Sequence, residues 1–490
     1  MKYKWMALAA CVLLLALSAT NLSAVPADEH PRYHQHMERP AYMPCADHGG
    51  AALCSHLPLV LIDTGGEAIP GVPIPDSDGD RTDDKFTTTA DGGTRLRAAI
   101  SVVDHAEGNN HPTDTPTLKS TIDIRVRGNS SRYFDKHSYL VRTLTDDGAA
   151  SRDVAMLGMD EFDEWALHGP YLDKSLIRNY MWYNLAGELM DYAPNVRFCE
   201  VLLNGEYQGL YVMTETINSS IDARLKLARP SRDAVQTSYV LRLDRGSGNE
   251  VKNIETFSQY ALRNLQDMDI VYPGTKWLTP ERAAWIARDF SDFEKSLYSY
   301  DYDTEPYAWW ERADMSSFVD YFILNEFTCN YDAGWLSTYV YKDIAGKYKM
   351  CIWDFNSACD NYSHPVTEPQ HFELQHNVWY FMLSKDEDFM NAVIDRYRAL
   401  RQGILSDEYL SGYIDAVVEW LCPAVDRNFS VWGYTLEKNM VSPAWRNPRT
   451  HEAAVAQMKR FCAERGAWMD AHIDILRQYS HESKVKKFNH

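Results

Sequence analysis

The stretch IWDFNSACD (352–360) follows closely on NYDAGWLSTYVYKD (330–343), and together they predict a strand–turn–strand hairpin. Asp354 stands at the end of a short apolar strand, and Asp332 precedes the other strand. The hairpin would therefore present two carboxylates at neighbouring positions. Such pairs serve divalent cations and phosphoryl transfer, where one carboxylate holds the metal and the other orients or deprotonates the attacking hydroxyl. The same spacing also fits ordinary turn and strand-end acids.

Length and charge narrow the class of protein. The 490 residues suffice for two or three domain-sized units, and a hydrophobic content of 45% is typical of a packed globular chain. The formal net charge of −20 argues against nucleic acid or an anionic membrane as the main partner, because no basic surplus is available to neutralise phosphates. A nucleotide needs only a few local cations and stays compatible with this charge.

The N-terminus has the pattern of a secretory signal. Lys2 and Lys4 form its positive end, residues 6–17 its apolar run, and residues 22–24 a small-residue cleavage site. We therefore expect an exported protein that is periplasmic, bound to the cell surface or secreted. The apolar run is too short to span a membrane and no other stretch is long enough, so no transmembrane segment is expected after signal removal.

Eight cysteines lie outside the predicted signal, an even number that is compatible with disulfides in an oxidising compartment. Cys45 with Cys54, and Cys422 with Cys462, are the candidates that lie close in sequence. None of the cysteines has a metal-site spacing such as C-x-x-C, so a structural zinc is not predicted.

The order of predicted elements indicates an α+β fold, with a β-rich first half and a helix-rich second half. Alternating or continuous apolar runs predict strands up to about residue 245, and apolar residues at helical spacing dominate after about residue 275. The expected units are a signal peptide (1–24), a flexible leader (25–56), a β-rich N-terminal lobe with nucleotide-clasp motifs (57–245), a helical C-terminal lobe with the catalytic and metal hairpin (246–480) and a basic tail (481–490).

The segment RGNSSRYFDKHSYLVR (127–142) places a glycine turn after a strand and then Lys136 and Arg142 around a second strand. Turn amides that face a phosphate, with a cation reaching it, would form a nucleotide clasp. A surface hairpin with paired charges explains the same residues.

Two further segments carry charges at the ends of elements. EWALHGPYLDKSLIRN (164–179) puts Arg178 at a helix start, where it could help to hold an anion or form a structural ion pair. VLLNGEYQGLYVMTETI (201–217) carries Glu215 near a strand end, where it could pair with a nucleotide-binding cation or face solvent. A last motif, YVLRLDRG (239–246), is interpreted as a strand that ends in a turn.

Taken in this order, the segments resemble the CotH family of kinase-like proteins first known from spore coats. The resemblance covers roughly residues 57–475 and implies an atypical protein-kinase-like fold. It also implies transfer of the ATP γ-phosphoryl group to Ser or Thr hydroxyls of a protein, with Mg²⁺ or Mn²⁺. The motifs that carry it are RGNSS with the following Lys136 and Tyr139, DKSLIRN, LNGEYxGLY with Glu215, NxD followed by STYVY, WDFN, and the helical run 377–401.

The resemblance also implies roles for single residues. Asp332 matches the catalytic aspartate, which accepts or orients the hydroxyl proton, and Asp354 matches the metal-binding aspartate. Lys136 and Arg142 fall at basic positions that could contact phosphates, Glu215 could hold that cation, and Arg178 is a further nucleotide-binding candidate. 

The chain departs from the family pattern at two metal positions. Ser337 stands where a metal-binding Asn is expected, and Asn356 replaces the last acid of W-D-x-D. A hydroxyl or an amide oxygen binds a hard cation less well than a carboxylate, so both changes weaken the second metal position. A catalytically degenerate, kinase-like surface binding protein is therefore the alternative to an active kinase. A hydrolase that uses the two carboxylates is less favoured because nothing marks a sugar-binding groove, and a serine hydrolase is less favoured because no nucleophile elbow is recognisable.

Overall fold

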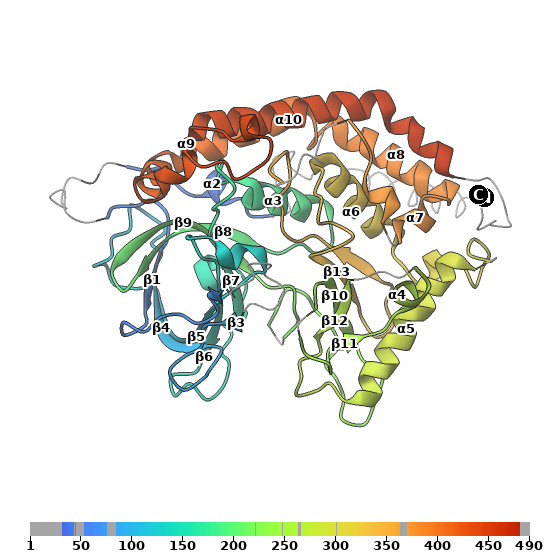
Figure 1. The fold of residues 1–490 in the computed structure, drawn as a ribbon, viewed down its shortest axis with the longest axis horizontal. Helices are drawn as coiled ribbons and strands as arrows, with labels where there is room; N and C mark the ends of the chain where they lie inside the picture. The colour runs from blue at the N-terminus through green and yellow to red at the C-terminus, as the bar shows by residue number, and fades with distance from the viewer. Residues whose placement is uncertain are drawn as a thin grey trace, which may run out of the picture.

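In the computed structural model, seven strands within the described residues close into a barrel in the order β1-β4-β5-β6-β7-β9-β8 (Figure 1). Closure comes from the parallel pairing of β1 with β8, in which Leu59 lies opposite Glu200. The barrel strands are β1 (Leu59–Asp63), β4 (Leu96–Val103), β5 (Leu118–Val126), β6 (Tyr139–Leu144), β7 (Glu164–His168), β8 (Val196–Leu203) and β9 (Glu206–Glu215). Strands β2 (Pro73–Ile74) and β3 (Lys85–Phe86) pair with each other in a separate two-stranded sheet.

The structure describes residues 32–43, 45, 53–75, 85–220, 222–246, 248–262, 266–299, 301–362, 370–377 and 379–480. The predicted signal peptide and the predicted basic tail lie outside these ranges. Part of the predicted flexible leader lies inside them, and it is packed. Gln35 is buried, donates to the carbonyl of Phe198 at 3.1 Å and accepts from the amide of Phe198 at 2.7 Å, so this segment is tied to β8.

The alternation predicted from sequence builds the barrel interior. In β5, Ile122, Ile124 and Val126 are fully buried in the barrel core, whereas Asp123 and Arg125 between them are half-buried on the outer face. The Asn-Gly pair forms the turn of the β8–β9 hairpin. Asn204 and Gly205 have φ values of 51° and 84°, which this tight turn requires and which Asn and Gly adopt most readily.

A second sheet has the order β11-β12-β10-β13-β14. Its strands are β10 (Tyr239–Asp244), β11 (Asn253–Ile254), β12 (Asp267–Tyr272), β13 (Thr338–Lys342) and β14 (Lys349–Cys351). The antiparallel pair β13–β14 is the hairpin expected from sequence. Because β10 pairs with β12 and β13, the predicted boundary between residues 245 and 246 falls directly after a strand of this second sheet.

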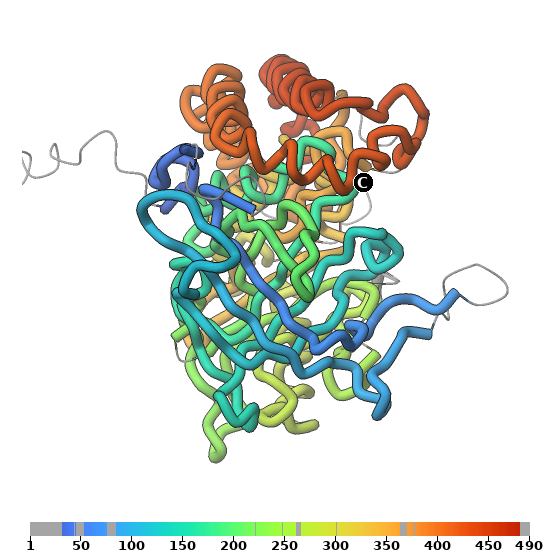
Figure 2. Tube along the Cα trace, turned by 90° about the vertical axis from the view of Figure 1, so that its left-hand side faces the viewer, coloured from blue at the N-terminus to red at the C-terminus, as the bar shows by residue number. Residues whose placement is uncertain are grey.

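Helices cover both sheets on one side. Figures 1 and 2 show α9 and α10 lying above the strands in both views. Capping explains the starts of α5 and α6: the Thr279 side chain accepts from the amide of Arg282, and the Asp314 side chain accepts from the amide of Ser317. The α-helices are α2 (Gln35–Glu38), α3 (Arg178–Leu189), α4 (Phe257–Leu262), α5 (Pro280–Tyr298), α6 (Met315–Thr328), α7 (Tyr380–Leu383), α8 (Glu387–Arg401), α9 (Asp407–Trp432) and α10 (His451–His472).

The fold therefore contains both helices and sheets, as the α+β prediction states. The closed barrel was not predicted, and the kinase-like fold stays a prediction. None of the helices in the described part of the chain is long and apolar enough to cross a membrane.

Candidate functional site

Three chain segments meet at one edge of the second sheet because of strand register. Leu243 of β10 lies opposite Thr338, and Tyr339 lies opposite Cys351 of β14. The C-terminal ends of β10 and β14 therefore reach the same edge as the N-terminal end of β13. Asp244, Ser337 and Asp354 lie at or just beyond these strand ends, so the register itself gathers them.

Asp332 reaches the same edge through the turn that follows α6. The helix ends at Cys329 in a left-handed conformation, and the side-chain amide of Asn330 donates to the carbonyl of Asp354 at 3.1 Å. The Asp332 carbonyl accepts from the amide of Leu336 at 2.7 Å, which closes the turn before β13. The loops that carry Asp332 and Asp354 are thus joined directly.

The charges at this edge are incompletely balanced. Burial and the negative charge of Asp354 together raise the pKa of Asp332 to about 6, and Arg245 opposes this rise. Burial also raises the pKa of Asp354, against the amide of Asn356 and the guanidinium of Arg127. Both carboxylates therefore resist ionisation in the absence of a cation. A bound cation would favour their ionised forms, because its positive charge offsets their mutual repulsion.

Two residues of this cluster were not singled out from sequence. Asp244, at the end of β10, contributes a negative charge that raises the pKa of both Asp332 and Asp354. Arg127, just beyond β5, places its guanidinium 5.5 Å from the ring of Trp353 and lowers the pKa of Asp354. Both residues belong to segments noted from sequence, YVLRLDRG and RGNSS, and Asp244 shares with Asp354 its place at a strand end.

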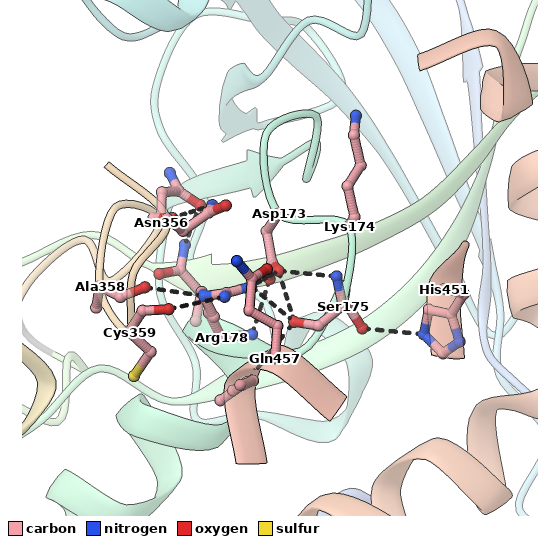
Figure 3. A network of polar contacts seen from close by, with 12 residues as sticks. Asp173, Lys174, Ser175, Arg178, Asn356, Ala358, Cys359, His451 and Gln457 are labelled. Carbon is pink, nitrogen blue, oxygen red and sulfur yellow. Dashed lines mark hydrogen bonds and ion pairs between the residues drawn. The ribbon is translucent and has the colours of Figure 1, made fainter. Parts of the chain in front are cut away.

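The DKSLIRN motif holds the loop that carries Asp354 (Figure 3). Arg178 donates from Nε to the carbonyl of Ala358 at 2.9 Å and from Nη2 to the carbonyl of Cys359 at 3.0 Å. Its Nη1 forms an ion pair with the buried Asp173. The structure therefore places Arg178 as a support for residues 352–360, the structural alternative noted from sequence.

Neighbouring residues orient Asp354 itself. The amide of Asp354 donates to the hydroxyl of Tyr183 at 2.8 Å, and the amide of Asn356 donates to the Asp354 carboxylate at 3.1 Å. The side-chain oxygen of Asn356 accepts from Asn179 at 3.4 Å. His168 at the end of β7 adjoins this group, and burial together with Arg127 lowers its pKa to about 3, so its imidazole is neutral.

The other predicted nucleotide contacts have structural partners elsewhere. The buried Lys136 ammonium donates to the carbonyl of Leu210 and to the side chain of Asn428, each at 2.7 Å. Glu215 accepts from the amide of Asn195 at 2.9 Å and from Arg224 at 3.1 Å. The expected pairing of Glu215 with Lys136 or Arg142 is not made in this structure: Glu215 contacts Asn195 and Arg224, and Lys136 contacts the carbonyl of Leu210 in the middle of β9.

Arg142 donates to Glu164 at 2.6 Å across the outer face of the barrel. Ser337 lies half-buried at the sheet edge with φ of 50°.

A cavity of 10 Å³ adjoins Asn330 and Tyr331, and a cavity of 560 Å³ is lined by Arg32, Arg197 and Arg224. Neither is lined by Asp332 or Asp354.

The ligand types at this edge suit a hard divalent cation, although in this structure the three carboxylates do not all come within 4.8 Å of one another. Asp244, Asp332 and Asp354 supply carboxylate oxygens, the ligands that Mg²⁺ and Mn²⁺ prefer. The side-chain oxygen of Asn330 is buried and has no hydrogen-bond partner among the described residues, although its amide nitrogen is bonded to the Asp354 loop. This buried oxygen, in the turn that carries Asp332, is available as a further ligand.

These features belong to a known class of protein. Residues 124–469 match the family described as CotH kinase protein, and this match covers more than half of the chain. The chain therefore belongs to the CotH family.

A curated relative is the inner spore coat protein H of Bacillus subtilis (strain 168), which is 32% identical over 107 residues. The alignment covers 22% of this chain and 27% of that relative, so the chain spans only about a quarter of the relative's length.

Proposed function

We propose that this protein is an atypical protein kinase that transfers the γ-phosphoryl group of ATP to Ser or Thr hydroxyls of extracytoplasmic proteins, with Mg²⁺ or Mn²⁺. The observation that carries the proposal is the meeting of Asp332 and Asp354 at one sheet edge, each with a raised pKa. Membership of the CotH kinase family supports the same reaction class.

Each residue at the edge has a role in this proposal. Asp354, with Asp244 and Asn330, would hold the divalent cation, which neutralises phosphate charge when it is bound. Asp332 orients the acceptor hydroxyl and accepts its proton. Arg127 lies on the barrel side of the acids and balances the negative charge of the transferred group.

The remaining candidates act differently in the proposal. Arg178 and Asn356 position Asp354 through the contacts described above. Lys136, Arg142 and Glu215 would have to leave their present partners to reach a nucleotide, so we propose Arg127 as the main cationic contact. Ser337 stands beside the acids as a weak oxygen ligand.

A phosphotransfer assay tests the proposal. The full chain, incubated with ATP labelled at the γ-position and either Mg²⁺ or Mn²⁺, should label Ser or Thr of itself or of co-secreted proteins. Asp332→Asn and Asp354→Ala should each abolish labelling, whereas Asp292→Asn, which removes an exposed carboxylate on α5, should not. Equal labelling by all four proteins would mean that the transfer does not depend on this site.

The second candidate is a non-catalytic binding protein on the same scaffold. Ser337 and Asn356 favour it, because the Asn356 side chain is engaged by Asn179 instead of standing as a second acid. Thermal unfolding with nucleotide separates the two functions. Stabilisation by ATP that requires the divalent cation supports the kinase, and no shift with any nucleotide supports the binding protein.

A further inference from the structure

Two segments far from the acid cluster are held side by side by a backbone bridge. Ser55 and Asn110 form an isolated antiparallel pair, with the Ser55 amide donating to the Asn110 carbonyl at 3.0 Å and the reverse bond at 2.6 Å. In an antiparallel pair, the residues on either side of the bridge also face each other. Cys54 and His111 therefore lie opposite one another.

The N-terminal segment is tied to the same place. The side-chain amide of Asn109 donates to the carbonyl of Met43 and to the sulfur of Cys54, the latter at 3.1 Å. The ring of Tyr42 lies against His56, with centroids 6.3 Å apart. These contacts bring Cys45 to the bridge.

The three side chains converge on one point. The sulfurs of Cys45 and Cys54 and a ring nitrogen of His111 all lie within 4.8 Å of one another. Both cysteines carry thiols and are not joined as a disulfide. In tetrahedral zinc sites, bond lengths of about 2.0–2.3 Å separate neighbouring ligand atoms by roughly 3.3–3.8 Å, which this cluster can meet with small side-chain shifts.

The surrounding contacts are those that orient metal ligands. Nδ1 of His111 lies 3.1 Å from the carboxylate of Asp114, which also accepts from the His111 backbone amide at 2.8 Å. A carboxylate on one ring nitrogen fixes the tautomer in which the other nitrogen, Nε2, presents its lone pair. The side-chain N–H of Asn109 that points at the sulfur of Cys54 would stabilise the thiolate form that binds a metal.

We propose that Cys45, Cys54 and His111 bind a zinc ion that fastens the N-terminal segment to the barrel. Two thiolates and a neutral imidazole balance a divalent charge, and soft sulfur with imidazole selects zinc over the hard cations proposed for the acid cluster. A fourth position is left for water. The absence of a C-x-x-C spacing does not count against this site, because its ligands come from three separate segments.

Metal analysis of the full chain tests the proposal. Protein purified without chelators from zinc-supplemented medium should contain about one zinc per chain. Cys54→Ser and His111→Ala should lose it, and Cys422→Ser, which removes an exposed thiol elsewhere, should keep it. Asp354→Ala should also keep it, which separates this site from the kinase proposal.

Titration of the wild-type protein with a mercurial thiol reagent covers the case in which a variant fails to fold. Zinc should be released in step with modification of two thiols. The proposal is overturned if peptide mapping finds a Cys45–Cys54 disulfide in the purified protein, if no zinc is bound after reconstitution, or if the variants retain it.

Discussion

The carboxylate of Asp332 is ionised at neutral pH. Its ionisation destabilises the folded state, because the group is partly buried and feels the negative charge of Asp354. Its pKa rises from 3.8 to about 6, so the folded protein holds this proton more tightly than the unfolded chain does. The contribution of the group to the free energy of unfolding is therefore fully present below about pH 4 and is lost as the pH rises through 6. Sites that bind charged ligands commonly carry such a cost in the ligand-free state.

We expect Asp332→Asn to remove this pH dependence. At pH 8 without divalent cations, the variant should be more stable than the wild type, by an amount on the order of 1 kcal/mol after allowance for solvent screening. At pH 4 the two proteins should have the same free energy of unfolding. Denaturant unfolding at both pH values in the presence of chelator measures the difference. A variant that is less stable than the wild type at pH 8 would contradict the electrostatic argument.

Arg127 is the residue whose role could not be assigned from sequence. We expect Arg127→Ala to lower kcat/KM for phosphotransfer by about 10- to 100-fold, since it removes a cation beside the acids, and Arg127→Lys to recover part of the loss. Arg97→Ala is the matched control, because Arg97 lies on the same barrel face and pairs with Asp123 at 2.8 Å. Equal losses in Arg97→Ala and Arg127→Ala would show that the effect is not local.

Residue-level prediction from sequence succeeded where the signal is local and failed where it depends on distant pairing. Asp332 and Asp354 belong to one hairpin, so their proximity follows from a short stretch of chain. Asp244 joins them only because β10 pairs with β13, which lies far along the sequence. Lys136 looked like a phosphate ligand from its glycine-containing neighbourhood, yet one of its two hydrogen-bond partners, Asn428, comes from a distant helix.

At the scale of elements, α3 and the loop over 352–360 behave as one unit. Arg178 joins them through two backbone carbonyls and the buried Asp173. We expect Arg178→Ala to destabilise the protein by about 3–5 kcal/mol, because it leaves a buried carboxylate without its partner. Asp173→Asn combined with Arg178→Met should cost less than Arg178→Ala alone. Urea unfolding of the three proteins measures the differences, and equal costs would argue against a buried ion pair.

Strand positions were predictable because alternation and turn residues are local, as in β5 and the β8–β9 hairpin. The closed barrel was not, because closure requires the parallel pairing of β1 with β8, and no local pattern specifies which strands become neighbours. Helix α3 begins at Arg178, and the residues just before it form a separate turn. The carboxylate of Asp173 caps a preceding turn by accepting from the amides of Ser175 and Arg178.

At the scale of the whole molecule, α9 docks on the barrel against β9. Asn428 of α9 accepts from both the Lys136 ammonium and the amide of Leu210, so three distant segments share one buried polar contact. Burial lowers the pKa of Lys136 well below its ordinary value. We therefore interpret Lys136 as a structural lysine, and expect Lys136→Met to leave the KM for ATP unchanged while it weakens the docking of α9.

Gly209 tests this docking without changing a charge. It adopts φ of +103°, and a Cβ at this position would lie 2.7 Å from the side-chain oxygen of Asn428. We expect Gly209→Ala to lower the midpoint of thermal unfolding by several degrees and to speed limited proteolysis of α9, since backbone strain and a displaced Asn428 act together. Gly65→Ala is the matched control: Gly65 also has a positive φ, +63°, but its Cβ would meet open space. If both variants lose the same stability and α9 is cleaved no faster in Gly209→Ala, then backbone strain alone explains the loss and the contact does not hold the helix to the barrel.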